Sequence, residues 1–250
     1  MSAPIGLQMY TLRDDAQQDF LGTLAQVAAL GYAGVELAGY GNLKASELAQ
    51  TLQKLGLRVS GAHTPLNRLE DDLDAVIDEM KQLDAKYVVC PWLPPDRRPD
   101  GQGYRELGRL LNDIGETCQE HGLQLVYHHH DFELQRFDGV TGLDLLLGES
   151  EPENVKAEID VFWASYAGFD PIALLKRLGT RVPLVHLKDM TPAPERTFAE
   201  VGHGTLDMPG ILAAADEIGA EWLLVEQDRT AGPALESVAK SIQYLRGLGR

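Results

Sequence analysis

Eight apolar segments of strand length alternate with eight segments of helical periodicity, and this alternation restricts the fold more than any other feature of the sequence. The expected strands are residues 5–10, 32–37, 57–63, 86–91, 123–127, 155–160, 182–187 and 222–226. The expected helices are residues 19–30, 44–55, 69–83, 104–121, 142–147, 171–178, 208–218 and 234–245. Strict alternation predicts parallel strands joined by right-handed crossovers.

Two observations favour a closed (β/α)8 TIM barrel over an open doubly wound sheet, which would also alternate. No GxGxxG turn follows the first expected strand, and the candidate site residues follow many strands instead of meeting at one switch point. Residues 92–103 are rich in Pro, Gly and Arg, but they follow a strand and precede a helix, so they indicate a βα loop and not a linker. We therefore predict a single α/β barrel domain over residues 1–250.

Composition limits the partners and the compartment. The formal net charge of −16 disfavours nucleic acid and anionic lipid as partners, because both would be repelled. The two cysteines, Cys90 and Cys118, are typical of a reduced intracellular protein and not of a disulfide scaffold. No signal peptide and no apolar run of membrane-spanning length is visible, so the expected location is the cytoplasm.

Four consecutive expected strands deliver a histidine or a carboxylate at or near their C-terminal ends. The four residues are His128, Asp160, His186 and Glu226. Because these ends of parallel strands meet at one rim of a barrel, the four side chains should form one site. A mixed set of nitrogen and oxygen ligands suits one divalent ion, such as Mn, Co, Zn, Fe or Mg. Each residue alone is more typical of a hydrogen-bonded structural position or a helix cap.

The residues around these four follow from strand alternation. His130 shares the inward face of His128 and is expected in contact with substrate or beside the metal ligands, whereas His129 faces outward as a packing or surface residue. Glu158 shares the face of Asp160, and Lys188 is its natural cationic partner. That pair is either a structural ion pair or a contact to substrate.

Further rim positions are candidates for substrate binding. They are Gln8, Tyr10, Glu36, His63, Glu133, Trp163, Lys188 and His203. His203 lies between two glycines, which would let a loop approach a ligand closely, although an exposed loop histidine is an equal alternative. Trp163 and Trp92 could wall the pocket and stack on a sugar, or belong to the core.

Several motifs together resemble the sugar phosphate isomerase/epimerase family of xylose isomerase-like barrels. The motifs are YHHHDFE (similar to YHNHDFEF), EIDVFW, HLKDM, VGHGTLD and VEQD. That superfamily also contains ketose 3-epimerases, inosose dehydratases, 3-keto-glycoside-processing enzymes and endonuclease IV. By the resemblance, Asp160, His186 and Glu226 correspond to metal ligands of the epimerases. His128 stands where those enzymes have a glutamate, which puts a symmetric two-carboxylate proton relay in doubt. Trp163 stands where the epimerases and endonuclease IV have a histidine, which is a second departure from both.

The expected chemistry is proton abstraction next to a carbonyl through a metal-stabilised enediolate. This chemistry predicts an isomerase or epimerase that acts on a sugar, sugar phosphate or cyclitol. A lyase of the same fold, resembling inosose dehydratases or 3-keto-glycoside-cleaving enzymes, is the alternative. An endonuclease IV-like enzyme and a non-catalytic barrel are less favoured. The candidate catalytic residues are Glu226, Glu158 and His130, with Glu133 as a further candidate base. Association into a homo-oligomer is left open.

Overall fold

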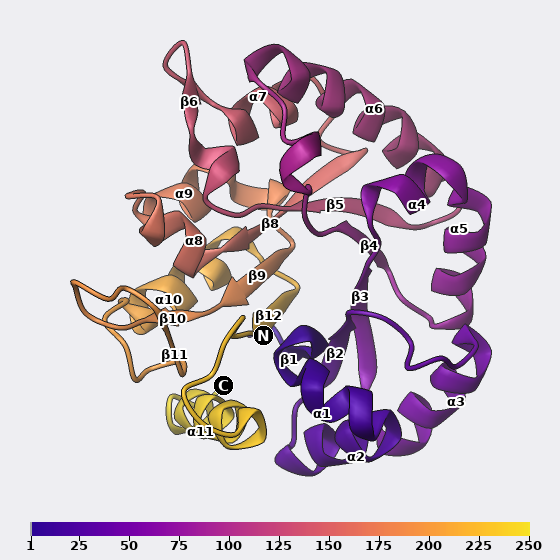
Figure 1. Ribbon diagram of the computed structural model, residues 1–250, viewed down its shortest axis with the longest axis vertical. Helices are drawn as coiled ribbons and strands as arrows, with labels where there is room; N and C mark the ends of the chain where they lie inside the picture. Colours follow the sequence, from indigo (N-terminus) through magenta and orange to yellow (C-terminus); the bar gives the residue numbers. More distant parts are fainter. Residues whose placement is uncertain (1) are drawn as a thin grey trace.

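A computed structural model describes residues 2–250, and its centre is a closed barrel of eight parallel strands. In barrel order the strands are β1 (Ile5–Gln8), β12 (Trp222–Val225), β9 (Leu184–Leu187), β8 (Val155–Asp160), β5 (Gln124–His128), β4 (Tyr87–Cys90), β3 (Arg58–His63) and β2 (Gly34–Leu37). Helices surround the strands (Figure 1). The predicted TIM-barrel fold is confirmed.

The eight expected helices are present, two of them (171–178 and 208–218) with the expected bounds and the other six with shifted ends. They are α2 (Phe20–Leu30), α3 (Ala45–Leu55), α5 (Leu73–Gln82), α6 (Gly101–Glu120), α7 (Gly142–Gly148), α9 (Pro171–Leu178), α10 (Met208–Ile218) and α11 (Ala234–Gly247). Helix α6 begins before residue 104, because the carboxylate of Asp100 accepts the backbone N–H of Gly103 and caps the helix there. The expected helix over 69–83 is interrupted at Asp72, whose backbone is not helical.

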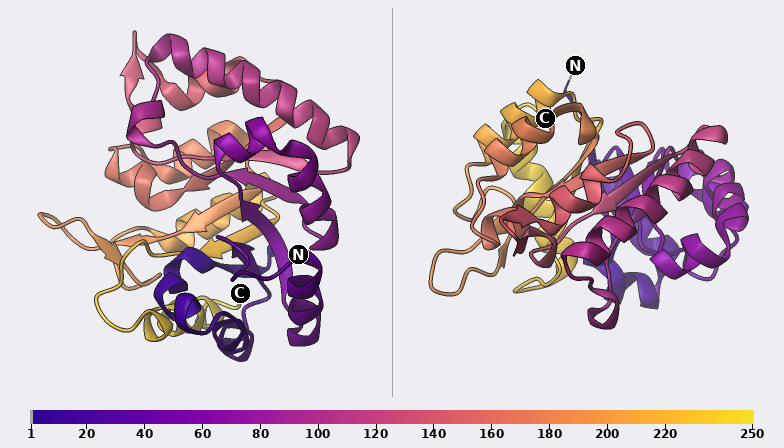
Figure 2. Two further views of the ribbon diagram at one scale, coloured as in Figure 1. Left: turned by 45° about the vertical axis from the view of Figure 1, so that its right-hand side comes forward. Right: turned by 90° about the horizontal axis from the view of Figure 1, so that it is seen from above.

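Short elements that strand and helix periodicity did not predict lie mainly in the loops. The additional helices are α1 (Arg13–Gln18), α4 (Leu66–Asp71), α8 (Val161–Tyr166), η1 (Met9–Leu12), η2 (Pro95–Arg97), η3 (Phe132–Leu134) and η4 (Gly179–Arg181). The small hairpins are β6 (Arg136–Phe137) with β7 (Val140–Thr141), and β10 (Asp189–Met190) with β11 (Phe198–Ala199). The segment that contains β10 and β11 projects from the body of the barrel (Figure 2).

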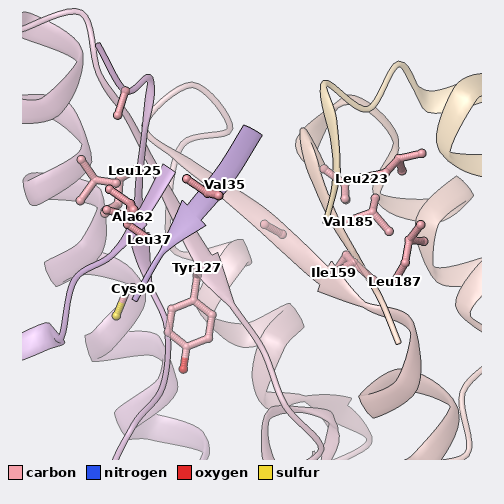
Figure 3. Close-up of a cluster of buried hydrophobic side chains, with 14 of the residues drawn as sticks. Val35, Leu37, Ala62, Cys90, Leu125, Tyr127, Ile159, Val185, Leu187 and Leu223 are labelled. Atoms are coloured by element: carbon pink, nitrogen blue, oxygen red, sulfur yellow. The ribbon is translucent and has the colours of Figure 1, made fainter. Parts of the chain in front are cut away.

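Alternation along the strands separates two apolar regions. The larger one packs the outward faces of the strands against the helices, and Figure 3 shows part of it, including Leu125, Tyr127 and Ile159. The smaller one fills the inside of the barrel and consists of Tyr87, Val89, Val126, Leu184, Trp222 and Leu224. Above this inner layer, at the C-terminal ends of the strands, the inward residues become charged.

No helix within residues 2–250 combines the length and the apolar character needed to cross a membrane.

Candidate active site

The polar interior of the barrel begins one step beyond its apolar inner layer. On β5, Val126 is followed on the same face by His128, and on β9, Leu184 is followed by His186. Glu158 and Asp160 supply two successive inward carboxylates on β8. All of these polar side chains are buried. A buried charge must be paired or must coordinate a metal, so this layer is where chemistry is expected.

The four predicted metal ligands converge, and we call His128, Asp160, His186 and Glu226 the upper set. One ligand atom from each residue lies within 4.8 Å of the others. Nδ1 of His186 is 2.6 Å from Oε2 of Glu226. Asp160 uses Oδ1 to accept the backbone N–H groups of Phe162 and Trp163 at the start of α8, and this capping leaves Oδ2 to the Lys188 ammonium 2.8 Å away. The role of the upper set as metal ligands stays a prediction.

The predicted pairing of Lys188 with Glu158 is wrong. The Lys188 ammonium lies 2.8 Å from Oδ2 of Asp160, 2.8 Å from Oε2 of Glu226 and 2.6 Å from Oδ1 of Asp228. Asp160 pairs in register with His186 and Glu158 with Leu184, so Lys188, two residues beyond His186, is closer to Asp160 than to the deeper Glu158. Burial alone would lower the pKa of Lys188, but these three carboxylates hold it well above its usual value.

A second group, which we call the lower set, lies deeper in the barrel and consists of Glu36, His63, Glu158 and His186. Oε2 of Glu36 is 2.8 Å from Nε2 of His186 and 3.1 Å from Nε2 of His63. Oε2 of Glu158 is 3.2 Å from the same His186 nitrogen. His186 therefore belongs to both sets, with Nε2 directed at the lower carboxylates and Nδ1 at Glu226.

The charges of the lower set are coupled. Burial favours the neutral form of His63, but Glu36 and Glu158 raise its pKa to about 9. The carboxylates of Glu158, Glu226 and Glu36 likewise hold the pKa of His186 well above its usual value despite burial. Burial and the neighbouring Glu36 raise the pKa of Glu158. Without a bound cation, the two imidazolium groups are the nearest positive charges to these carboxylates.

A cavity of about 730 Å³ opens above the upper set and has the size expected for a small-molecule site. Of the predicted site residues, it is lined by Tyr10, His63, His128, His130, Trp163, Lys188 and Glu226. Sequence reasoning missed Tyr40, Arg68, Asp131, Phe132 and Asp228, which also line it. The missed residues lie outside the barrel strands, where periodicity carries no information. Only Asp228 could have been predicted from the sequence, because it lies two residues after Glu226 and would share its face.

Seven predicted site residues do not line this cavity, and their roles stay predictions. Two of the seven, Asp160 and His186, belong to the upper set beneath the cavity. Gln8 and Glu36 are fully buried below it, and the Gln8 side chain donates a hydrogen bond to Oε2 of Glu36 at 2.6 Å. Glu158 is also fully buried and does not line the cavity, and its catalytic role stays a prediction. The two remaining residues, Glu133 and His203, lie away from the upper set.

Glu133 is a structural carboxylate beneath the loop after β5. It accepts the Tyr127 hydroxyl at 2.7 Å and the His130 backbone N–H at 2.8 Å. Burial raises its pKa to about 7, against the lowering effect of these hydrogen bonds. His203 is exposed on a loop that Asp189 holds in place and does not line the cavity, and its contact with substrate stays a prediction.

The three consecutive histidines take three positions. His128 points into the barrel. His129 is buried, accepts the Asp160 backbone N–H through Nε2 and donates from Nδ1 to the carbonyl of His130, so it packs as predicted. The His130 ring stacks on Phe132 with centroids 5.7 Å apart and lies 5.6 Å from the Trp163 ring. Burial, assisted by the Lys188 charge, lowers the pKa of His130 well below its usual value and keeps the ring neutral.

These features define a (β/α)8 barrel with a histidine–carboxylate cluster below a cavity at the C-terminal ends of its strands. The chain belongs to the xylose isomerase-like TIM barrel family, whose model matches residues 24–248. The resemblance drawn from the motifs is confirmed at the level of the family.

Individual relatives agree with this assignment. The chain is 28% identical to the rhizopine catabolism protein MocC of Rhizobium meliloti over 84% of this chain and 75% of MocC. It is 28% identical to an inosose dehydratase of Mesomycoplasma hyopneumoniae (strain 7448) over 90% of this chain and 87% of that protein. The crystal structure of a sugar phosphate isomerase/epimerase from Parabacteroides distasonis ATCC 8503 superimposes with a TM-score of 0.87 at 24% identity, covering 98% of this chain and 96% of that one.

Proposed function

We propose that this protein is a divalent-metal-dependent isomerase or epimerase that removes the proton next to the carbonyl of a sugar, keto-sugar or keto-cyclitol. The observation that most strongly supports this proposal is that His128, Asp160, His186 and Glu226 converge from four neighbouring strands below a cavity large enough for a sugar. The net charge of −16 supports a small molecule over a nucleic acid as substrate.

The upper set fits a divalent cation. Oδ2 of Asp160 is buried and takes no part in capping α8, and the four residues offer nitrogen and oxygen ligands from separate strands. The Lys188 ammonium contacts Asp160 and Glu226 of this set. It also contacts Asp228, which is not one of the four ligands, so Lys188 would keep a carboxylate partner when a cation binds the other two. A bound cation would act as a Lewis acid on the substrate carbonyl.

Glu226 is the residue best placed to move the proton. It lines the cavity, and the Lys188 and His186 charges lower its pKa despite burial, so it is ionised at neutral pH. When a substrate oxygen takes Lys188 as its hydrogen-bond donor, Glu226 loses a neighbouring cation and becomes a stronger base. Neutral His130 also faces the cavity and would serve as the second proton carrier.

A lyase reaction is the second candidate, in which the same proton abstraction is followed by loss of a β-hydroxyl or β-alkoxyl group. Two observations favour it. The similarity to an inosose dehydratase extends over most of both chains. In addition, His128 occupies the strand-end position on β5, so Glu226 has no second carboxylate facing it from that strand.

Deuterium incorporation tests the proposal. The metal-loaded protein would be incubated in deuterated water with ketoses, inososes and 3-keto-glycosides, and NMR would follow exchange next to the carbonyl. We expect exchange with at least one substrate class, and a loss of about 100-fold or more in Glu226→Gln. The product then separates isomer, epimer and elimination product. No exchange with any class in metal-replete protein would contradict the proposal.

A further inference from the structure

We propose that the lower set, Glu36, His63, Glu158 and His186, is a second divalent-cation site, one layer deeper in the barrel than the upper set. Its ligand atoms are already grouped for this role. Four contacts between its histidine nitrogens and its carboxylate oxygens measure 2.8, 3.1, 3.2 and 3.8 Å. Ligand atoms that surround one tetrahedral metal at usual bond lengths lie about 3.3 Å apart, so little movement is needed.

Unpartnered oxygens support a cation at this position. Oε1 of Glu158 and Oε1 of Glu36 are buried without a hydrogen-bond partner among residues 2–250, whereas their Oε2 atoms lie 3.2 Å and 2.8 Å from Nε2 of His186. Both side chains are fully buried. Leaving such groups unsatisfied is costly, and coordination to a cation removes that cost.

The charge balance points the same way. Five carboxylates face the polar interior, namely Glu36, Glu158, Asp160, Glu226 and Asp228, against the single ammonium of Lys188. With the imidazoles neutral, this leaves a formal excess of four negative charges. Lys188 contacts only the upper carboxylates and Asp228. Two divalent cations, one in each set, would balance these four charges, and a His186 imidazolate between them would add one negative charge.

His186 connects the two sets. Its Nε2 faces Glu36 and Glu158, and its Nδ1 faces Glu226. One ring serves two ions when it is an imidazolate with an ion on each nitrogen, and binding of the second ion then releases the remaining ring proton to solvent. The rival interpretation is that Glu36 and Glu158 only orient His186 for a single ion in the upper set.

Adjacent inward positions on β8 provide a matched pair of variants. Glu158→Gln removes a ligand of the lower set only, and Asp160→Asn removes a ligand of the upper set only. Equilibrium dialysis with Mn²⁺ would give the stoichiometry of the wild type and of both variants, and anomalous diffraction from Mn²⁺-soaked wild-type crystals would locate the ions.

We expect two equivalents and two anomalous peaks in the wild type. Glu158→Gln should keep one equivalent, as should Asp160→Asn. Should Glu158→Gln fail to fold, the wild-type anomalous map decides alone. A single ion in either set overturns the proposal, as does an unchanged saturation stoichiometry in Glu158→Gln with only a 10–100-fold weaker affinity, which is the effect of an orienting residue. These readouts do not depend on catalysis, so failure of the proposed reaction would be seen separately.

Discussion

At the scale of single residues, the chemistry depends on which layer of the barrel a side chain occupies. Glu158 and Asp160 are two residues apart on one face of β8, yet Glu158 contacts the histidines and Asp160 contacts Lys188. Lys188 is the fixed positive charge of the upper layer. Removing one partner of a buried ion pair costs more than the pair contributes, because the remaining charges stay buried without compensation.

Lys188→Met tests this balance. In chelator-treated protein at neutral pH, we expect the free energy of unfolding to fall by about 3 kcal/mol, because Asp160 and Glu226 lose their ammonium partner. Mn²⁺ should bind more tightly, since the ammonium no longer competes for the same oxygens. Urea unfolding with and without Mn²⁺ measures both effects.

Lys240→Met is the matched control, because Lys240 forms an exposed ion pair with Glu200 on the surface. It should change neither the free energy of unfolding nor the Mn²⁺ affinity appreciably. Equal behaviour of the two variants would contradict the role assigned to Lys188.

Glu133 gives a prediction about pH. Its pKa is raised by burial to about 7, so the folded state binds a proton that the unfolded state releases above its ordinary pKa near 4.5. The wild type therefore loses stability as pH rises from about 4.5 through 7. Glu133→Gln, which mimics the protonated side chain, should remove this loss and exceed the wild type by up to about 3 kcal/mol at pH 8.

Urea unfolding of wild type and Glu133→Gln at pH 5 and pH 8 would measure that difference. The Tyr127 hydroxyl can rotate to accept a hydrogen bond from the new amide. A stability difference that is the same at both pH values would rule out titration of Glu133 in this range.

At the scale of elements, Asp189 organises the loop that follows β9. Its carboxylate accepts the backbone N–H groups of Met190, Gly202, Gly204 and Leu206 at 2.8–3.1 Å. Gly204 leaves no room for a side chain, since a Cβ there would lie 2.2 Å from Oδ1 of Asp189. The glycines of this segment therefore permit close packing around the Asp189 carboxylate.

Asp189→Asn should loosen this loop. One acceptor oxygen becomes an amide donor, so backbone N–H groups lose their partner, and we expect a loss of about 2–3 kcal/mol in unfolding free energy. Limited proteolysis should show faster cleavage within residues 190–206. Asp207→Asn is the control: Asp207 accepts only the Gly210 N–H at the start of α10, so it should cost less than 1 kcal/mol. Equal cleavage of both variants would contradict the prediction.

At the scale of the whole molecule, the barrel assembles ligands from β5, β8, β9 and β12, so cation binding should stabilise the folded chain as a unit. At a free cation concentration 100 times its Kd, one site contributes about 2.7 kcal/mol. For a chain of this size, we expect Mn²⁺ or Co²⁺ to raise Tm by about 5–10 °C, and a chelator to reverse the rise. Differential scanning calorimetry measures the shift.

The double variant Asp160→Asn, Glu226→Gln should lose the part of this Tm shift that comes from the upper set. A chain whose Tm does not respond to Mn²⁺, Co²⁺ or Zn²⁺ would contradict a metal role for the cluster. Ca²⁺ should have a weaker effect than Mn²⁺, because the sets include histidine nitrogens, which Ca²⁺ does not favour.

The sequence by itself determined the barrel and the strand ends at which the upper set lies. Both follow from local rules: apolar periodicity distinguishes strand from helix, and a two-residue alternation sets the inward face of each strand. His128, His186 and Glu226 were accessible to this reasoning because each stands at or near the end of an apolar strand.

Only the tertiary structure decided how the inward residues pair. The lower set joins side chains of β2 and β3 to those of β8 and β9, which are not neighbours in the barrel, and Lys188 lies level with Asp160 and Glu226 instead of Glu158. Strand tilt and register set these depths, and both arise from closure of the whole sheet. Local periodicity fixes the face of a residue, whereas its depth and its partners depend on strands that lie far apart in the chain.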